Sequence, residues 1–158
     1  MSGSARHGGC RCGRVRFEAS GEPLLTMACH CTGCQRMTAS AFSLTDTYPA
    51  DSFKVTEGET VIGGMHGATR HHFCDYCKSW VHTEPEGLDE IVNVRSTLFD
   101  EPGRERPFVE VFTGEGLPWA KTGAEHSFAT LPAMDEWPRL IGQFAGRATA
   151  WGKEEFNP

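Results

Sequence analysis

The sequence predicts a mainly β fold of short strands, held together in part by metal-binding cysteines and followed by one C-terminal helix. Three observations lead to this expectation. First, 18 glycines and 9 prolines are spread along the whole chain, which is typical of turns between many short elements. Second, several short runs alternate apolar and polar residues with the period of two of a half-buried strand. Third, seven cysteines occur in three tight groups.

The expected strands are all short. The clearest is Arg14–Ala19, in which Val15, Phe17 and Ala19 fall on one face. The segment "FKVTEGETVIGG" has apolar residues on both sides of the turn residues 57–60, and it predicts a hairpin. Gly or Pro separates most of the remaining candidates, which are Ala41–Thr45, Arg70–Phe73, Trp80–Thr83, Ile91–Val94 and Phe108–Phe112.

One helix is expected near the C-terminus, over about 135–146. Asp135 is placed to cap its N-terminus and Gly146 to end it. An apolar stripe along one face is best interpreted as core packing, and it consists of Trp137, Leu140, Ile141 and Phe144. The tail 148–158 is expected to lie on the body of the protein or to join the contact of a possible homodimer.

Length and composition narrow the function. At 158 residues the chain has the size of one ordinary domain, so we expect a single domain over 1–158. Leu, Ile, Val and Phe make up only about 18% of the residues, and something besides the core is therefore expected to stabilise the fold. The net charge of -6, with no cluster of Lys and Arg, argues against a nucleic-acid-binding surface.

The chain is also expected to stay away from membranes. Its N-terminal segment "MSGSARHGGC" lacks the apolar run of a signal peptide, and no stretch approaches the roughly 18 apolar residues of a membrane helix. A cytoplasmic location is therefore expected. In that reducing compartment, cysteines are more often metal ligands or catalytic groups than disulfides.

The seven cysteines are the strongest chemical signal. Thiolates spaced by one or two residues in tight turns can converge on one ion, and zinc takes tetrahedral thiolate ligands. Three groups that use every cysteine therefore predict metal binding. The groups are Cys10 and Cys12 in "GCRCG", Cys29, Cys31 and Cys34 in "CHCTGC", and Cys74 and Cys77 in "FCDYCK".

Spacing alone leaves two divisions of these groups open. Cys31 and Cys34 can pair with Cys74 and Cys77 as a two-knuckle ribbon. Alternatively, the first and third groups form a closed four-sulfur site, and the second group remains as a three-sulfur site. In the second division every cysteine belongs to a metal site. It also provides the two kinds of zinc site found in proteins, one closed and one with an open coordination place.

Several segments carry a family resemblance: "GGCRCGRVRFEA", "CHCTGCQRMTASAF", "FKVTEGE", "FCDYCKSW" and "VNVRSTLFDEP", followed by Pro118 and Trp119. Together they resemble the glutathione-dependent formaldehyde-activating enzyme family, whose domain also occurs in centromere protein V. The resemblance covers about 9–119 and leaves a C-terminal extension. It implies a zinc-stapled β-tent of short antiparallel strands with two zinc ions. It assigns the structural zinc to Cys10, Cys12, Cys74 and Cys77, and the catalytic zinc to Cys29, Cys31 and Cys34.

The resemblance also implies an activity. The substrate would be glutathione, and the reaction its reversible addition to formaldehyde to give S-(hydroxymethyl)glutathione, which is carbon-sulfur lyase or synthase chemistry. A site of three thiolates is consistent with a thiol substrate. Three thiolates bound to one Zn²⁺ give the site a net negative charge. Such a zinc ion is a poorer Lewis acid toward water than zinc held by neutral imidazoles. A soft, sulfur-rich ion favours a further thiolate, so we expect the substrate to supply the fourth sulfur.

Two positions depart from the family pattern. Lys78 follows the Cys74–Cys77 knuckle where the family usually has Gly, and Ala39 also replaces a usual Gly. A residue after such a knuckle often has a positive φ, which costs Lys about 1 to 2 kcal/mol. Both departures are expected to affect the shape of the substrate pocket.

Other polar and aromatic residues near these motifs are candidates for the pocket or for ordinary packing. His30 lies between two ligands and is expected to point away from the ion. Either His71 or His72 is a candidate for the pocket wall, the alternative being ordinary packing in a strand. Trp119 is expected in the core or in the pocket wall. Candidates to pair with the carboxylates of glutathione are Arg36, Arg70 and Lys121, although such charges are usually solvated.

The alternative to an enzyme is a zinc-stapled module that binds a small thiol or a partner without turnover. The missing basic tail and the retained three-cysteine group favour an enzyme or a small-thiol binder over a chromatin protein.

Overall fold

The structure of the protein is a computed structural model that describes residues 4–101 and 106–151. Eleven strands and two α-helices lie within these ranges, together with four short 3₁₀ turns. The expected mainly β fold with a C-terminal helix is therefore confirmed. No helix in the described ranges is both long enough and apolar enough to cross a membrane.

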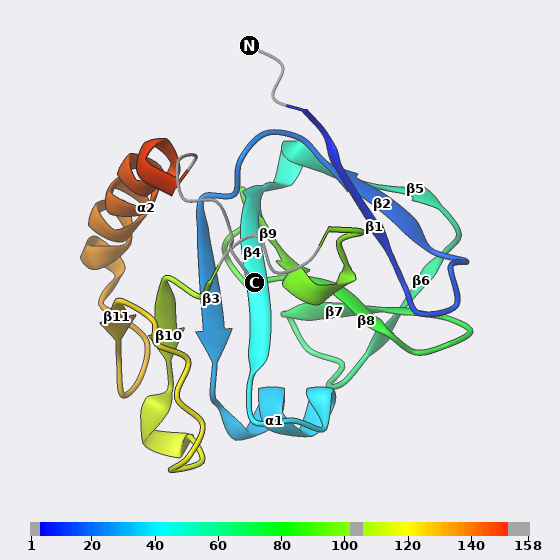
Figure 1. Cartoon of the computed structure of the whole chain (residues 1–158). Coiled ribbons are helices and arrows are strands. Elements are labelled where there is room, and N and C mark those ends of the chain that lie inside the picture. The colour runs from blue at the N-terminus through cyan, green and yellow to red at the C-terminus, as the bar shows by residue number, and fades with distance from the viewer. Residues whose placement is uncertain (1–3, 102–105, 152–158) are drawn as a thin grey trace, which may run out of the picture.

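The strands form two sheets (Figure 1). The smaller sheet is antiparallel, with the order β1 (Arg6–Gly9), β2 (Arg16–Ala19), β5 (Phe53–Glu57). The larger has the order β11 (His126–Ser127), β10 (Val109–Val111), β3 (Leu25–Cys29), β4 (Ser43–Pro49), β9 (Ile91–Arg95), β8 (Trp80–Glu84), β7 (Arg70–Cys74), β6 (Thr60–Gly63). Its pairs are antiparallel, except that β10 runs parallel to both β3 and β11.

The predicted hairpin between β5 and β6 is wrong. β5 pairs with β2 in the smaller sheet, whereas β6 pairs with β7 in the larger one. The chain passes between the sheets near Gly58, which has a positive φ of 75°. A Cβ atom there would lie 2.2 Å from the carbonyl oxygen of Arg14, so this close approach requires glycine. The two apolar runs are strands, but alternation reports a buried face and not the strand that pairs with it.

The other predicted strands are all present, and the structure adds elements that the sequence pattern did not predict. These are β1, β3, β11 and a short helix, α1 (Thr32–Thr38). Helix α1 has only seven residues, too few to show a helical period. Strands β1 and β11 are four and two residues long, and they likewise offer little alternation to detect.

The first hydrophobic core lies where the smaller sheet meets the larger one. The predicted inward face of β2 is buried, and Phe17 makes an edge-to-face contact with Phe99 at a centroid distance of 5.3 Å. This burial fixes the smaller sheet on β8 and β9. The cluster contains Val15, Phe17, Ala19, Tyr48, Val81, Val92, Val94 and Phe99, and also two cysteines, Cys10 and Cys74.

A second core lies under helix α2 (Trp137–Trp151), which covers β3 and β10 at the edge of the molecule opposite the smaller sheet (Figure 1). Leu140 is fully buried against Phe108, Val109 and Val111. Trp137 and Phe144 pack around this cluster, which confirms the predicted apolar stripe.

The predicted ends of this helix are wrong. Asp135 lies within a 3₁₀ turn (Met134–Glu136) that leads into α2, and this turn has no side-chain cap. The helix also continues through Gly146 to Trp151, because one interior glycine costs only about 1 kcal/mol. The part of the tail from 152 onward lies outside the described residues.

Replacing Leu140 by Ala tests the attachment of α2. The free energy of unfolding, measured by urea titration of metal-loaded protein, should fall by about 2 to 4 kcal/mol because a fully buried side chain leaves a cavity. The matched control is Leu131→Ala, at a side chain that is 55% exposed, where the change should stay within about 0.5 kcal/mol. Equal effects of the two substitutions would contradict the packing of α2 on the sheet.

Candidate metal centres

The structure decides between the two divisions of the cysteines. The ligand atoms of Cys10, Cys12, Cys74 and Cys77 all lie within 4.8 Å of one another, and those of Cys29, Cys31 and Cys34 form a second group within the same limit. The two-knuckle ribbon is therefore wrong, and the division into four and three sulfurs is the one observed.

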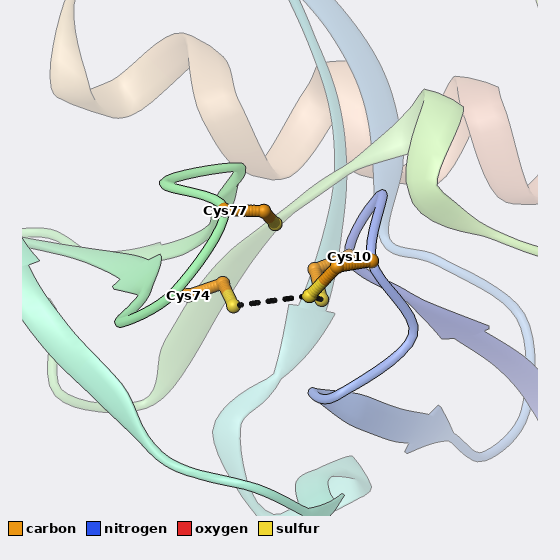
Figure 2. A group of neighbouring side chains, drawn as sticks. Cys10, Cys74 and Cys77 are labelled. Carbon is orange, nitrogen blue, oxygen red and sulfur yellow. Dashed lines mark hydrogen bonds between the residues drawn. The ribbon is translucent and has the colours of Figure 1, made fainter.

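The four-sulfur cluster joins the two sheets. Cys10 and Cys12 lie in the turn between β1 and β2, and Cys74 and Cys77 in the turn between β7 and β8. Figure 2 shows Cys74 and Cys77 on one turn facing Cys10 on the other.

The spacing of these sulfurs suits a metal ion. The sulfur of Cys12 lies 3.4 Å from that of Cys10 and 3.8 Å from that of Cys74. Tetrahedral thiolates bound to zinc at 2.3 Å would lie about 3.8 Å apart. The cluster can therefore hold a tetrahedral metal ion with little rearrangement.

Hydrogen bonds prepare both turns for this role. The Val15 N–H donates to the sulfur of Cys10 at 3.3 Å. The hydroxyl of Ser79 accepts the Arg11 N–H at 3.1 Å and lies 3.2 Å from the sulfur of Cys77, which links the two turns. Burial has the largest single effect on the pKa of Cys77 and raises it, but hydrogen bonds with Ser79, Cys12 and Cys74 together outweigh burial and lower the pKa to about 5. A thiolate is thus favoured at this position.

Lys78 has the positive φ expected after the knuckle, at 57°. Its N–H donates to the carbonyl of Cys74 at 3.0 Å and closes the turn. The left-handed backbone of Lys78 therefore destabilises the folded protein by about 1 to 2 kcal/mol relative to glycine at this position. Ala39 is also left-handed, with φ 49°, where it ends α1.

The three-sulfur cluster is built where β3 ends and α1 begins. Cys29 is the last residue of β3, and Cys31 is the N-cap of α1, whose sulfur accepts the Cys34 N–H at 3.3 Å. The positive end of the helix favours thiolates at this place. Among the described residues, no further Cys, His, Asp or Glu completes this group.

Protons are unevenly distributed in the three-sulfur cluster. A hydrogen bond from the Cys29 thiol lowers the pKa of Cys34 to about 6, and the charge of Arg95 acts in the same direction. The same contact with Cys34, together with burial, raises the pKa of Cys29. Without metal, the cluster therefore holds a thiolate at Cys34 and a proton at Cys29 near neutral pH.

Arg95 is a neighbour of this cluster that the sequence analysis missed. Cys29 pairs with Ser43, and Thr45, two residues further along β4, pairs with Arg95. These side chains therefore project from one face of the sheet. Burial lowers the pKa of Arg95 to about 10, so its guanidinium stays charged at neutral pH. The available signal was an arginine at the end of the apolar strand "IVNVR".

An open cleft of about 450 Å³ borders both cysteine clusters, because its lining residues Ser43 and Ser79 contact Cys34 and Cys77. The C-terminal half of α1 and the turn after Cys77 both contribute to its lining. Lys78 lines the cleft and Ala39 lies between two lining residues, so both departures from the family pattern border it. The lining residues are Met37, Thr38, Ser40, Phe42, Ser43, Leu44, Lys78, Ser79, Trp80, Arg95, Thr97 and Leu98.

The predicted basic and aromatic candidates lie elsewhere. Arg36 and Lys121 are exposed, Arg70 pairs with Glu84 at 2.6 Å, and none of the three lines the cleft. Trp119 is 74% exposed, so its expected place in the core is wrong, and it does not line the cleft.

The histidines near the cysteines also lie outside the cleft. His30 is buried, and its Nε2 lies 2.9 Å from a carboxylate oxygen of Glu110 rather than within the sulfur cluster. His71 and His72 both lie on β7, where their Nδ1 atoms contact the hydroxyls of Thr83 and Thr60 at 2.9 and 3.1 Å. These contacts fit strand packing.

A third group of metal-ligand types, His72, His82 and Glu84, was not predicted. The rings of His72 and His82 are stacked, with centroids 4.2 Å apart and an interplanar angle of 8°. The ring-nitrogen lone pairs therefore lie in nearly parallel planes, which does not favour convergence on one ion. Glu84 pairs with Arg70, and burial lowers the pKa of His82 to about 3, which keeps it neutral. We interpret this group as cross-strand packing.

Comparisons with known proteins agree with this architecture. The chain is similar to a solved structure of a protein from Rhodobacter sphaeroides, with 22% identity and a TM-score of 0.52 over 61% of this chain and 90% of that one. This likeness concerns the fold alone. None of the curated proteins matches closely enough to count as a relative. The family model of the glutathione-dependent formaldehyde-activating enzyme matches residues 5–115, a region that includes all seven cysteines. This chain therefore belongs to the glutathione-dependent formaldehyde-activating enzyme family.

Proposed function

We propose that the protein is a zinc-dependent carbon-sulfur lyase or synthase that acts on a thiol adduct, with glutathione and formaldehyde as the reacting pair. The observation that carries this proposal is the three-sulfur cluster beside the cleft, which has no fourth ligand among the described residues. The family membership supports the choice of glutathione and formaldehyde.

The two clusters have different roles in this proposal. Cys10, Cys12, Cys74 and Cys77 hold a structural zinc, because four thiolates complete a tetrahedral site. Cys29, Cys31 and Cys34 hold the catalytic zinc and leave one coordination place open. Bound there, zinc supplies a soft Lewis acid that favours thiolate ligands and lowers the pKa of a coordinating thiol.

The residues of the chain then orient the substrate. The cleft holds the thiol close to the cluster, so the sulfur and a small aldehyde meet in one place. The C–S bond would form when the sulfur adds to the carbonyl carbon and the π bond of the carbonyl breaks, and the carbonyl oxygen would take up one proton, which balances the proton lost by the thiol. Arg95 offsets the excess negative charge of the thiolates, because its charge interacts with Cys29 and Cys34. Thiols must stay reduced for this chemistry, which favours a cytoplasmic location.

The different roles of the clusters can be tested by comparing Cys77→Ser with Cys31→Ser. Cys77→Ser should abolish a stable fold, because a structural zinc contributes about 10 kcal/mol of apparent binding energy. Cys31→Ser should leave the fold nearly intact, because serine preserves the N-cap of α1. Thermal melts and elemental analysis should show one zinc ion retained in Cys31→Ser. Equal damage by the two substitutions would contradict this division.

Turnover separates an enzyme from the alternative of a thiol-binding module. Zinc-loaded protein should accelerate the exchange of formaldehyde between its free and glutathione-bound forms, measured by NMR exchange spectroscopy. Cys31→Ser should remove this acceleration while its fold persists. Binding of glutathione seen by calorimetry, with no acceleration by the wild-type protein, would favour the module.

The fourth ligand is tested by substituting cobalt for zinc. Glutathione should strengthen the sulfur-to-metal charge-transfer absorption of a tetrahedral site, because a fourth thiolate joins three. S-methylglutathione has the same carboxylates and amine but no ionisable thiol, so it should have no such effect. An equal response to both compounds would show binding through the peptide and would remove the basis for thiol activation.

A further inference from the structure

Arg95 is a buried cation with few hydrogen bonds. The residue is 7% exposed, and its guanidinium stacks on the ring of Trp80 at 3.9 Å. A side-chain nitrogen donates to the carbonyl of Asn93 at 3.4 Å, while the buried Nε has no hydrogen-bond partner. Burying a charge without such partners is unfavourable. This position therefore favours an anion.

The cleft that contains Arg95 has the composition of an anion site. Its lining includes Arg95 and Lys78 and no Asp or Glu, although the whole chain carries a net charge of -6. The other lining residues are either hydroxyl-bearing or apolar. The volume of about 450 Å³ is within the usual range for small-molecule sites.

The three-sulfur cluster contributes to the balance of charge in this region. Arg95 interacts with the charges of Cys34, Cys29 and Asp46, so part of its charge is already offset. A fourth thiolate from a substrate would make the metal site more negative still. A substrate that also carries a carboxylate would be repelled unless a second cation lay near its path.

Lys78 lies where that second cation is needed. Its ammonium pairs with Asp75 at 3.0 Å, with both side chains largely exposed. Such a surface pair is weak, so the ammonium can exchange Asp75 for a substrate carboxylate. Its backbone, held at φ 57°, places this side chain in the cleft wall.

We propose that the buried Arg95 and the exposed Lys78 bind a carboxylate of the thiol substrate in this cleft, while the sulfur occupies the three-cysteine cluster. This inference rests on the proposed function and identifies the residues that make this site selective for carboxylate-bearing thiols. Lys78 then favours an acidic thiol at a place where the family usually has glycine.

The test compares two thiols on cobalt-substituted protein. 3-Mercaptopropionate carries a carboxylate, and 2-mercaptoethanol carries an uncharged hydroxyl. Dissociation constants come from the charge-transfer absorption and from calorimetry. The acid should bind at least about tenfold more tightly, the size expected of one charge-assisted hydrogen bond.

Three variants assign this preference to residues. Arg95→Gln should remove most of the preference for the acid, and Lys78→Gly part of it. Glycine suits the positive φ at position 78, so Lys78→Gly should fold at least as well as the wild type. The control is Arg36→Gln, which removes the same charge two residues from Cys34 but outside the cleft. It should keep the full preference.

The outcomes separate this inference from the proposed function. Equal affinities of the wild type for the two thiols would overturn the inference, as would an Arg95→Gln variant that weakens both thiols equally. If Arg95→Gln fails to fold, Lys78→Glu decides, because it should reduce the preference for the acid further than Lys78→Gly does. If neither thiol changes the cobalt spectrum, the proposed function itself is contradicted.

Discussion

The convergence of four cysteine sulfurs is the constraint on which the rest of this structure depends. It joins the β1–β2 turn to the β7–β8 turn and so fixes the smaller sheet on the larger one. Cys10 and Cys74 are themselves buried in the core between the sheets. In a chain with few large aliphatic side chains, metal-binding energy at such a point can replace hydrophobic burial as a source of stability.

The same cluster also shapes the substrate region. The turn after Cys77 supplies Lys78 and Ser79 to the cleft, and the other end of the cleft belongs to α1, which begins at the three-sulfur cluster. Segments that carry each of the two clusters therefore line one cleft. A side chain at position 78 therefore borders the cleft although its backbone belongs to the four-sulfur turn.

The two cysteine clusters differ chemically because different segments of the chain supply their sulfurs. Two turns supply two sulfurs each to the first cluster, which completes a tetrahedron. The second cluster draws on one strand end and one helix start, and among the described residues nothing supplies a fourth ligand. The open side is bordered by the buried cation of Arg95. In the function proposed above, negative charge at the sulfurs and positive charge in the cleft would together select for a thiol that is also an anion.

The sequence by itself determined the local features of the protein. Alternation identified the buried face of β2, the helical period identified the face of α2 that contains Leu140, and the knuckle spacing indicated the left-handed Lys78. Tertiary structure alone decided that β5 and β6 join different sheets and that Arg95 lies beside the second cysteine group. It also selected the division of the cysteines into four and three, which the spacing left open and the family resemblance implied. Periodicity and turn chemistry act over a few residues, whereas these pairings join positions far apart in the chain. They depend on which buried faces pack together, and that information is absent from any single segment.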